Sequence, residues 1–172
     1  MKTFYFFLFV ILICIVQVTA LDNVRIFNVK PDLLLVAVVM AGLYFEWKSA
    51  LFLSITAGFL KDACGTNITS LYTFLFPLWC YLVIRISRKI SIEENNLFFS
   101  ISAGIVALIN IPLEKIIYMG SGNSIPFGLF LRISVIEVLY TALSASFLFI
   151  VLKPLLFMKA PSKEEPREEG LL

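Results

Sequence analysis

Three ionisable side chains fall inside long apolar stretches of the sequence: Asp62, Arg132 and Glu137. On insertion scales, an Asp or Arg at the centre of a membrane helix costs about 2.5–3.5 kcal/mol. Such residues therefore usually face the interior of a helix bundle and pair with a counter-charge, often at a functional site. We take these three as candidate structural or partner-binding polar residues.

The rise of about 1.5 Å per helical residue estimates how deep these side chains lie. A helix that enters from outside near Phe127 carries Arg132 about 8 Å and Glu137 about 15 Å into the membrane. A helix that enters from inside near Ser49 carries Asp62 to about 10 Å from the outer edge of a core about 30 Å thick. We predict that Asp62 and Arg132 pair, or share a polar pocket in the outer third. Glu137 is expected to hydrogen-bond within the bundle, and a protonated carboxyl group is one form in which it can do so.

Asp62 also occupies an unfavourable position in its own helix. Gly65 is a typical residue to follow a helix end, which places Asp62 in the last turn. A carboxylate there opposes the helix dipole, whereas Lys61 suits it. We therefore expect another part of the bundle to compensate Asp62. The alternative is a hydrated, unpaired Asp62 in the headgroup region.

The sequence gives little support for catalysis, and we assign no catalytic residue, metal ligand or cofactor site. There is no histidine, no HExxH motif and no Gly-rich phosphate loop. The three cysteines, Cys14, Cys64 and Cys80, form no CxxC pair and are interpreted as small buried hydrophobic residues. An intramembrane carboxylate enzyme that uses Asp62 and Glu137 is the less favoured alternative.

The elements that must position these side chains are predicted to be membrane helices. Of the 172 residues, 60% are hydrophobic and 15% charged, unlike a soluble domain with about 25% charged residues. An all-α integral membrane bundle of six transmembrane helices is predicted, because lipid offers no partner for an open sheet edge. The predicted spans are Phe4–Leu21, Asp32–Phe45, Ser49–Cys64, Ile68–Ile84, Asn96–Leu113 and Phe127–Leu152.

The first span has a second interpretation, and the loop charges predict an orientation. Val18-Thr19-Ala20 resembles a signal-peptide cleavage site, which would leave five spans. If all six are retained with the N-terminus inside, nine Lys and Arg residues lie in the cytoplasm and four outside, which favours cytoplasmic termini. The nine are Lys2, Lys48, Arg85, Arg88, Lys89, Lys153, Lys159, Lys163 and Arg167, and the four are Arg25, Lys30, Lys61 and Lys115.

The chain is expected to divide into a six-span domain, residues 1–157, and a cytoplasmic tail, residues 158–172. The tail is polar and interrupted by proline, which predicts disorder. The net charge of +2 is too small to indicate nucleic-acid binding. Membrane lipid is the expected surrounding.

Pairs of small residues four positions apart predict which helix faces turn inward. Helices in lipid associate by close packing through such residues. The pairs are Ser54 with Gly58, Ser100 with Gly104, and Ala142 with Ser146.

The order of several short motifs resembles a known family. Gln17 near the end of the first span precedes Pro31-Asp32, which opens "LLLVAVVMAG". The third span ends in "GFLKDACGT", which includes Gly58, Phe59, Asp62 and Gly65, and "SLYTFLFPLWCYL" and a basic loop follow. This arrangement resembles the rod shape-determining protein MreD family over about Gln17 to Ala107. The chain lacks the Leu-Gly pair that often follows the Asp segment, and its second half matches no motif of the family.

The resemblance implies a non-enzymatic membrane component of the bacterial cell-elongation (rod) complex. Such a protein resides in the cytoplasmic membrane and regulates cell shape and peptidoglycan synthesis by scaffolding partner membrane proteins. The implied partners are MreC and, through it, MreB and the elongation-specific peptidoglycan glycosyltransferase and transpeptidase. The family's fold is similar to the substrate-binding subunits of energy-coupling-factor transporters. The alternative function is therefore that of a substrate-binding subunit of a vitamin transporter.

Overall fold

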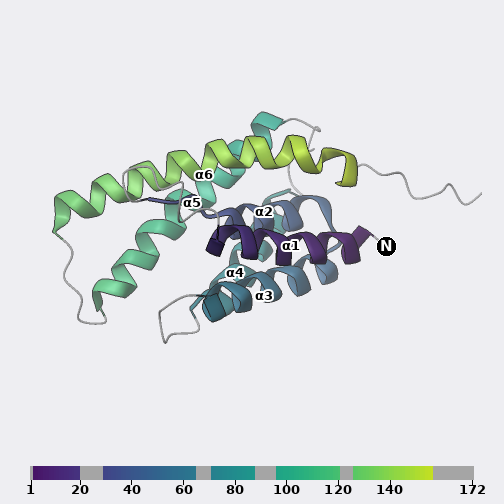
Figure 1. The fold of residues 1–172 in the computed structure, drawn as a ribbon, viewed down its shortest axis with the longest axis horizontal. Helices are drawn as coiled ribbons and strands as arrows, with labels where there is room; N and C mark the ends of the chain where they lie inside the picture. The colour runs from purple at the N-terminus through teal and green to yellow at the C-terminus, as the bar shows by residue number, and fades with distance from the viewer. Residues whose placement is uncertain (1, 20–28, 65–70, 88–95, 121–125, 157–172) are drawn as a thin grey trace, which may run out of the picture.

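The computed structural model describes residues 2–19, 29–64, 71–87, 96–120 and 126–156, which form six α-helices (Figure 1). The predicted tail, residues 158–172, and the motif residue Gly65 lie outside the described residues. The helices are α1 (Lys2–Thr19), α2 (Leu33–Tyr44), α3 (Trp47–Cys64), α4 (Leu71–Ser87), α5 (Asn96–Gly120) and α6 (Phe127–Leu156).

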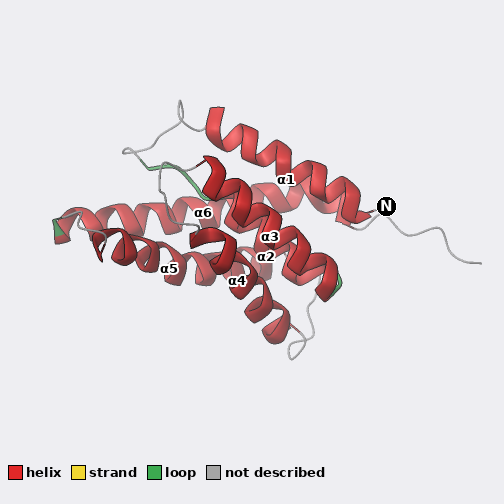
Figure 2. Cartoon of the chain, turned by 90° about the horizontal axis from the view of Figure 1, so that it is seen from below, coloured by secondary structure: helices red, strands yellow, loops and turns green. Residues whose placement is uncertain are grey.

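The short helix α2 forms the centre of the bundle. Every residue from Leu33 to Gly42 is buried, so the helix shows no polar face at all. Its sequence is apolar all round, which is the pattern of a helix surrounded by others. All five other helices contact α2. Figure 2 shows α5 and α6 side by side on one side of the bundle, with α1 and α3 on the other.

Helices α3 and α4 pack with their backbones in close contact. Gly58 of α3 faces the first turn of α4, where an added Cβ would lie 2.3 Å from the carbonyl oxygen of Tyr72. Ser54, one turn earlier on α3, is fully buried. The predicted inward orientation of Ser54 and Gly58 is confirmed, and the contact requires glycine at position 58.

The two other small-residue pairs face each other across α5 and α6. The Oγ atoms of Ser100 and Ser146 lie 2.7 Å apart in a hydrogen bond. One turn away, a Cβ at Gly104 would lie 3.5 Å from the Cβ of Ala142. The sequence predicted that each pair turns inward, and the structure adds that they form one contact between the two helices.

Helix α5 continues seven residues beyond its predicted end at Leu113. Pro112 lies inside the helix, where its missing N–H leaves one backbone carbonyl without a helical donor. Apolar helices tolerate such a proline when neighbouring groups satisfy the freed backbone atoms. The placement of Lys115 in an outer loop was therefore wrong, because Lys115 belongs to α5.

The outer surface of the bundle is strongly apolar. Leu139, Leu143, Phe147 and Ile150 follow one face of α6 at helical spacing and are each at least 60% exposed. Two helical segments of the described chain, Phe98–Ile117 and Phe127–Lys153, are long and apolar enough to cross a membrane. The start of α1 and the end of α6 lie at the same end of the bundle (Figure 1).

Candidate functional site

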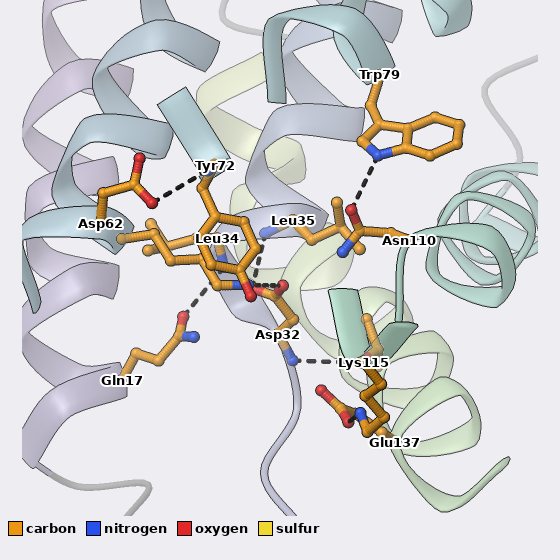
Figure 3. A network of polar contacts seen from close by, with 12 residues as sticks. Gln17, Asp32, Leu34, Leu35, Asp62, Tyr72, Trp79, Asn110, Lys115 and Glu137 are labelled. Carbon is orange, nitrogen blue, oxygen red and sulfur yellow. Dashed lines mark hydrogen bonds and ion pairs between the residues drawn. The ribbon is translucent and has the colours of Figure 1, made fainter. Parts of the chain in front are cut away.

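A buried polar site surrounds the N-terminus of α2 (Figure 3). The Asp32 carboxylate accepts a hydrogen bond from the backbone N–H of Leu35 (3.1 Å), and thereby caps the helix. The Gln17 Oε1 atom, from α1, accepts a hydrogen bond from the N–H of Leu34 (3.2 Å). Helix N-termini leave free N–H groups that are costly to bury without acceptors. Gln17 and Asp32 supply those acceptors, and both side chains are buried.

Asp32 also connects α2 to α6 and to α3. Its backbone N–H donates to the hydroxyl of Thr141 on α6 (3.2 Å). Its second carboxylate oxygen pairs with the Nζ atom of Lys61, in the last turn of α3. Only 4% of the Asp32 side chain is exposed, and a carboxylate so deeply buried requires a nearby cation. The charge count assigned Lys61 to the outer side of the membrane, and the structure adds that its side chain points into the bundle.

Lys61 is enclosed by aromatic rings as well as by its carboxylate partner. The Nζ atom lies 3.8 Å from the centre of the Tyr72 ring and 5.2 Å from that of Phe76. A cation over an aromatic face is attracted by the ring quadrupole, more strongly when water is excluded. Glu114 of α5 lies near enough to act electrostatically on both Lys61 and Tyr72. The ammonium group is therefore held between the Asp32 carboxylate at the start of α2 and the aromatic rings of α4.

Asp62 caps a neighbouring helix. Its two carboxylate oxygens accept hydrogen bonds from the N–H of Tyr72 (3.0 Å) and the N–H of Thr73 (2.8 Å), in the first turn of α4. The Thr73 hydroxyl adds a third hydrogen bond at 2.6 Å. A carboxylate that is unfavourable at the C-terminus of its own helix is favourable at the N-terminus of the next. This is the compensation that the sequence requires.

The expected partner of Asp62 was nevertheless wrong. Its hydrogen-bond partners within the described helices are these α4 groups rather than Arg132. Arg132 lies on an exposed part of α6.

Glu137 hydrogen-bonds within the bundle, as predicted from its depth. Its Oε2 atom lies 2.6 Å from the Nζ atom of Lys115, which connects α6 to α5. Both side chains are largely buried. Lys115 is therefore the hydrogen-bonding partner within the bundle that the depth of Glu137 required. Sequence reasoning missed Lys115 because the predicted span ended at Leu113, two residues before it.

A further interhelical hydrogen bond joins α4 to α5. The indole Nε1–H of Trp79 donates to the Oδ1 atom of Asn110 (2.9 Å), and Asn110 is completely buried. Both residues lie inside predicted spans, but neither was singled out. An Asn in the middle of an apolar helix was the available signal, because interhelical hydrogen bonds often hold such helices together.

The polar side chains in this region connect helices. Asp32, Lys61, Asp62 and Glu137 each bind a helix end or a counter-charge. In the part of the chain that the structure describes, no group of three or more His, Cys, Asp or Glu side chains could hold a metal ion. The arrangement fixes the relative positions of the helices.

The residues of the family-like motifs gather where α1, α2, α3 and α4 meet. Gln17 and Asp32 hold the N-terminus of α2, while Gly58 and Asp62 hold that of α4. Pro31 is buried just before the α2 cap. Phe59 behaves differently, because 63% of its side chain is exposed on the outside of α3. Its role is therefore not in this polar site.

An apolar groove lies beside the polar site, between α1 and α6. Its walls include Leu12 and Val16 of α1 and Leu143 and Phe147 of α6. The start of α2, including Leu33, forms its floor. The groove has a volume of about 530 Å³.

The comparisons with known proteins now give the family. A family model described as rod shape-determining protein MreD matches residues 1–159. The chain belongs to the MreD family. The match covers α5 and α6, where the sequence showed no motif of the MreD family.

The remaining comparisons add no relative. No curated protein matches the chain, and no solved structure does. The fold similarity to transporter subunits that the MreD resemblance implied therefore receives no support from solved structures, and the vitamin-transporter alternative is not supported.

Proposed function

We propose that this MreD-family protein is a non-enzymatic, multi-pass component of the cell-elongation complex that holds partner membrane proteins by lateral helix contacts. Membership of the family supports a role in rod shape determination. The observation that carries the proposal is that the buried charged side chains bind other groups of the same bundle. Asp32 pairs with Lys61, Glu137 pairs with Lys115, and Asp62 caps α4. Such an interior suits a rigid scaffold.

In this proposal all six helices cross the cytoplasmic membrane, with both termini in the cytoplasm. The apolar outer faces support this placement, as does the common end shared by the start of α1 and the end of α6. Residues 1–157 then form the membrane domain, and residues 158–172 a disordered cytoplasmic tail. Arg132 remains a candidate partner-binding residue on the outer part of α6.

The groove between α1 and α6 is the surface that we assign to a partner helix. Helices in lipid gain little from the hydrophobic effect and associate through shape and van der Waals contact. A concave apolar surface offers a helix more contact than a convex one. The partner is expected to be a membrane helix of MreC, and through it the protein would reach MreB and the peptidoglycan glycosyltransferase and transpeptidase.

The test replaces the chromosomal gene in the source cell with variants of the protein. Depletion should convert rods to round cells, and the unchanged protein should restore them. Leu143→Trp narrows the groove and should restore rod shape poorly. Leu139→Trp is the matched control, because Leu139 is one turn away on α6, similarly exposed and outside the groove lining.

Photo-crosslinking identifies the occupant of the groove. A crosslinker at position 143 should capture a partner membrane protein, whereas one at position 139 should not. Crosslinks from position 143 to lipid alone would overturn the groove assignment. Unchanged rod shape after depletion would overturn the role in elongation.

A further inference from the structure

Two cysteines that are far apart in the sequence meet at the end of α3. The Sγ atom of Cys14, on α1, lies 3.5 Å from the Sγ atom of Cys64, the last residue of α3. Cys14 is buried and Cys64 is exposed, and both are free thiols. The sequence predicted three separate buried cysteines, which is wrong for Cys64.

The helices already hold the two side chains in position for a bond. A disulfide requires the sulfur atoms to approach to about 2.05 Å. The helices α1 and α3 are in contact, so rotation of the two cysteine side chains can close much of the remaining distance. The stacked rings of Phe7 and Phe52, 6.2 Å apart, belong to the same contact about two turns away from Cys14. The third cysteine, Cys80, is buried on α4.

We propose that Cys14 and Cys64 are a redox modification site, at which an intramolecular disulfide forms and fastens α1 to α3. The oxidant is a protein or low-molecular-weight disulfide. The exposed Cys64 thiolate attacks one of its sulfur atoms, which forms a mixed disulfide and expels the first thiol. The Cys14 thiolate then attacks the Cys64 sulfur and expels the second. The two protein thiols lose two electrons and two protons, which the two released thiols carry away.

The disulfide would join two elements that hold other helices. Cys14 precedes Gln17 by three residues, and Gln17 binds the N-terminus of α2. Cys64 follows Asp62 by two residues, and Asp62 binds the N-terminus of α4. The end of α3 already binds the starts of α2 and α4, through Lys61 and Asp62. Oxidation would fasten α1 to this same end of α3. This inference is independent of the scaffold proposal.

Thiol counting in the purified full-length protein tests the inference. The protein is treated with oxidised glutathione, denatured and labelled with a polyethylene-glycol maleimide. The unmodified chain should change from three labels to one, and Cys80→Ser from two to none. Both should remain monomeric, with Cys14 and Cys64 joined in one cross-linked peptide by mass spectrometry.

A displaced pair is the matched control. In Val10→Cys combined with Cys14→Ser and Cys80→Ser, the α1 thiol moves one turn along the same face. This variant should oxidise at least tenfold more slowly than Cys80→Ser. Retention of all labels, a disulfide only between two molecules, or equal rates for the two variants would each overturn the inference.

Discussion

Asp62, in the last turn of α3, accepts hydrogen bonds from both the backbone N–H and the hydroxyl of Thr73, in the first turn of α4. A single carboxylate thus joins the end of one helix to the beginning of the next, and the polar site is built largely from contacts of this kind.

Removing this cap should destabilise the start of α4. Asp62→Ala is expected to lower the free energy of unfolding by about 1–2 kcal/mol, because two N–H groups lose their acceptor. Asp62→Asn keeps one acceptor oxygen and should cost less. Thermal unfolding in detergent measures both.

Exchanging the charges of Asp62 and Arg132 distinguishes the helix cap on α4 from the ion pair that was predicted from depth. Asp62→Arg combined with Arg132→Asp should be no more stable than Asp62→Arg alone, since Asp62 binds α4. Recovery of stability in the double variant would contradict this assignment.

Gly58 should tolerate no larger residue. Gly58→Ala places a methyl group 2.3 Å from the Tyr72 carbonyl oxygen, so α3 and α4 must move apart. We expect a loss of about 1–3 kcal/mol, as for other overpacked contacts. Gly104→Ala is the matched control, because its methyl group would meet only Ala142 at an ordinary distance of 3.5 Å. Similar melting temperatures for the two variants would show that the α3–α4 contact is not as close as described.

The pair of Asp32 and Lys61 should be more costly to break than to replace. Lys61→Met leaves the buried Asp32 carboxylate without its cation, and about 3 kcal/mol of stability should be lost. Asp32→Asn combined with Lys61→Met removes both charges and keeps a capping side chain on α2. The double variant should therefore unfold at a higher temperature than Lys61→Met. The reverse order would argue against a buried ion pair.

Exchange of the charges between α5 and α6 should preserve the bundle. Glu137→Lys places two ammonium groups together and should reduce the yield of folded protein in the membrane. Lys115→Glu combined with Glu137→Lys restores opposite charges and should recover most of that yield, as measured by size-exclusion chromatography. Failure of the double variant to recover would indicate that the pair at 2.6 Å contributes through geometry that the exchanged side chains cannot reproduce.

Helices and their packing faces could be predicted because they depend on patterns along the chain. The small-residue pairs identified the α3 face at Ser54 and Gly58, and the α5–α6 contact at Ser100 and Ser146. Apolar runs located α1 to α4 within about three residues at each end. Only α5, which continues through Pro112, and the end of α6 differed further.

The partners of the polar residues could not be predicted, because depth along a helix says nothing about rotation around it. Asp62 and Arg132 were placed at a similar level, yet the Asp62 carboxylate faces α4. Thr141 gave no signal, since a threonine inside an apolar run commonly bonds to its own helix.

The contacts at the end of α3 fix the number of residues between Gly58 and Asp62. Gly58 and Asp62 are one helical turn apart and both meet the first turn of α4, while Lys61 points to Asp32. Each residue turns the helix by about 100°. One residue inserted or deleted between Gly58 and Lys61 would therefore point the Lys61 and Asp62 side chains away from their present partners. Substitutions at Leu60 keep this register, but changes in length do not. Homologues that build this junction should therefore keep the spacing between Gly58 and Asp62.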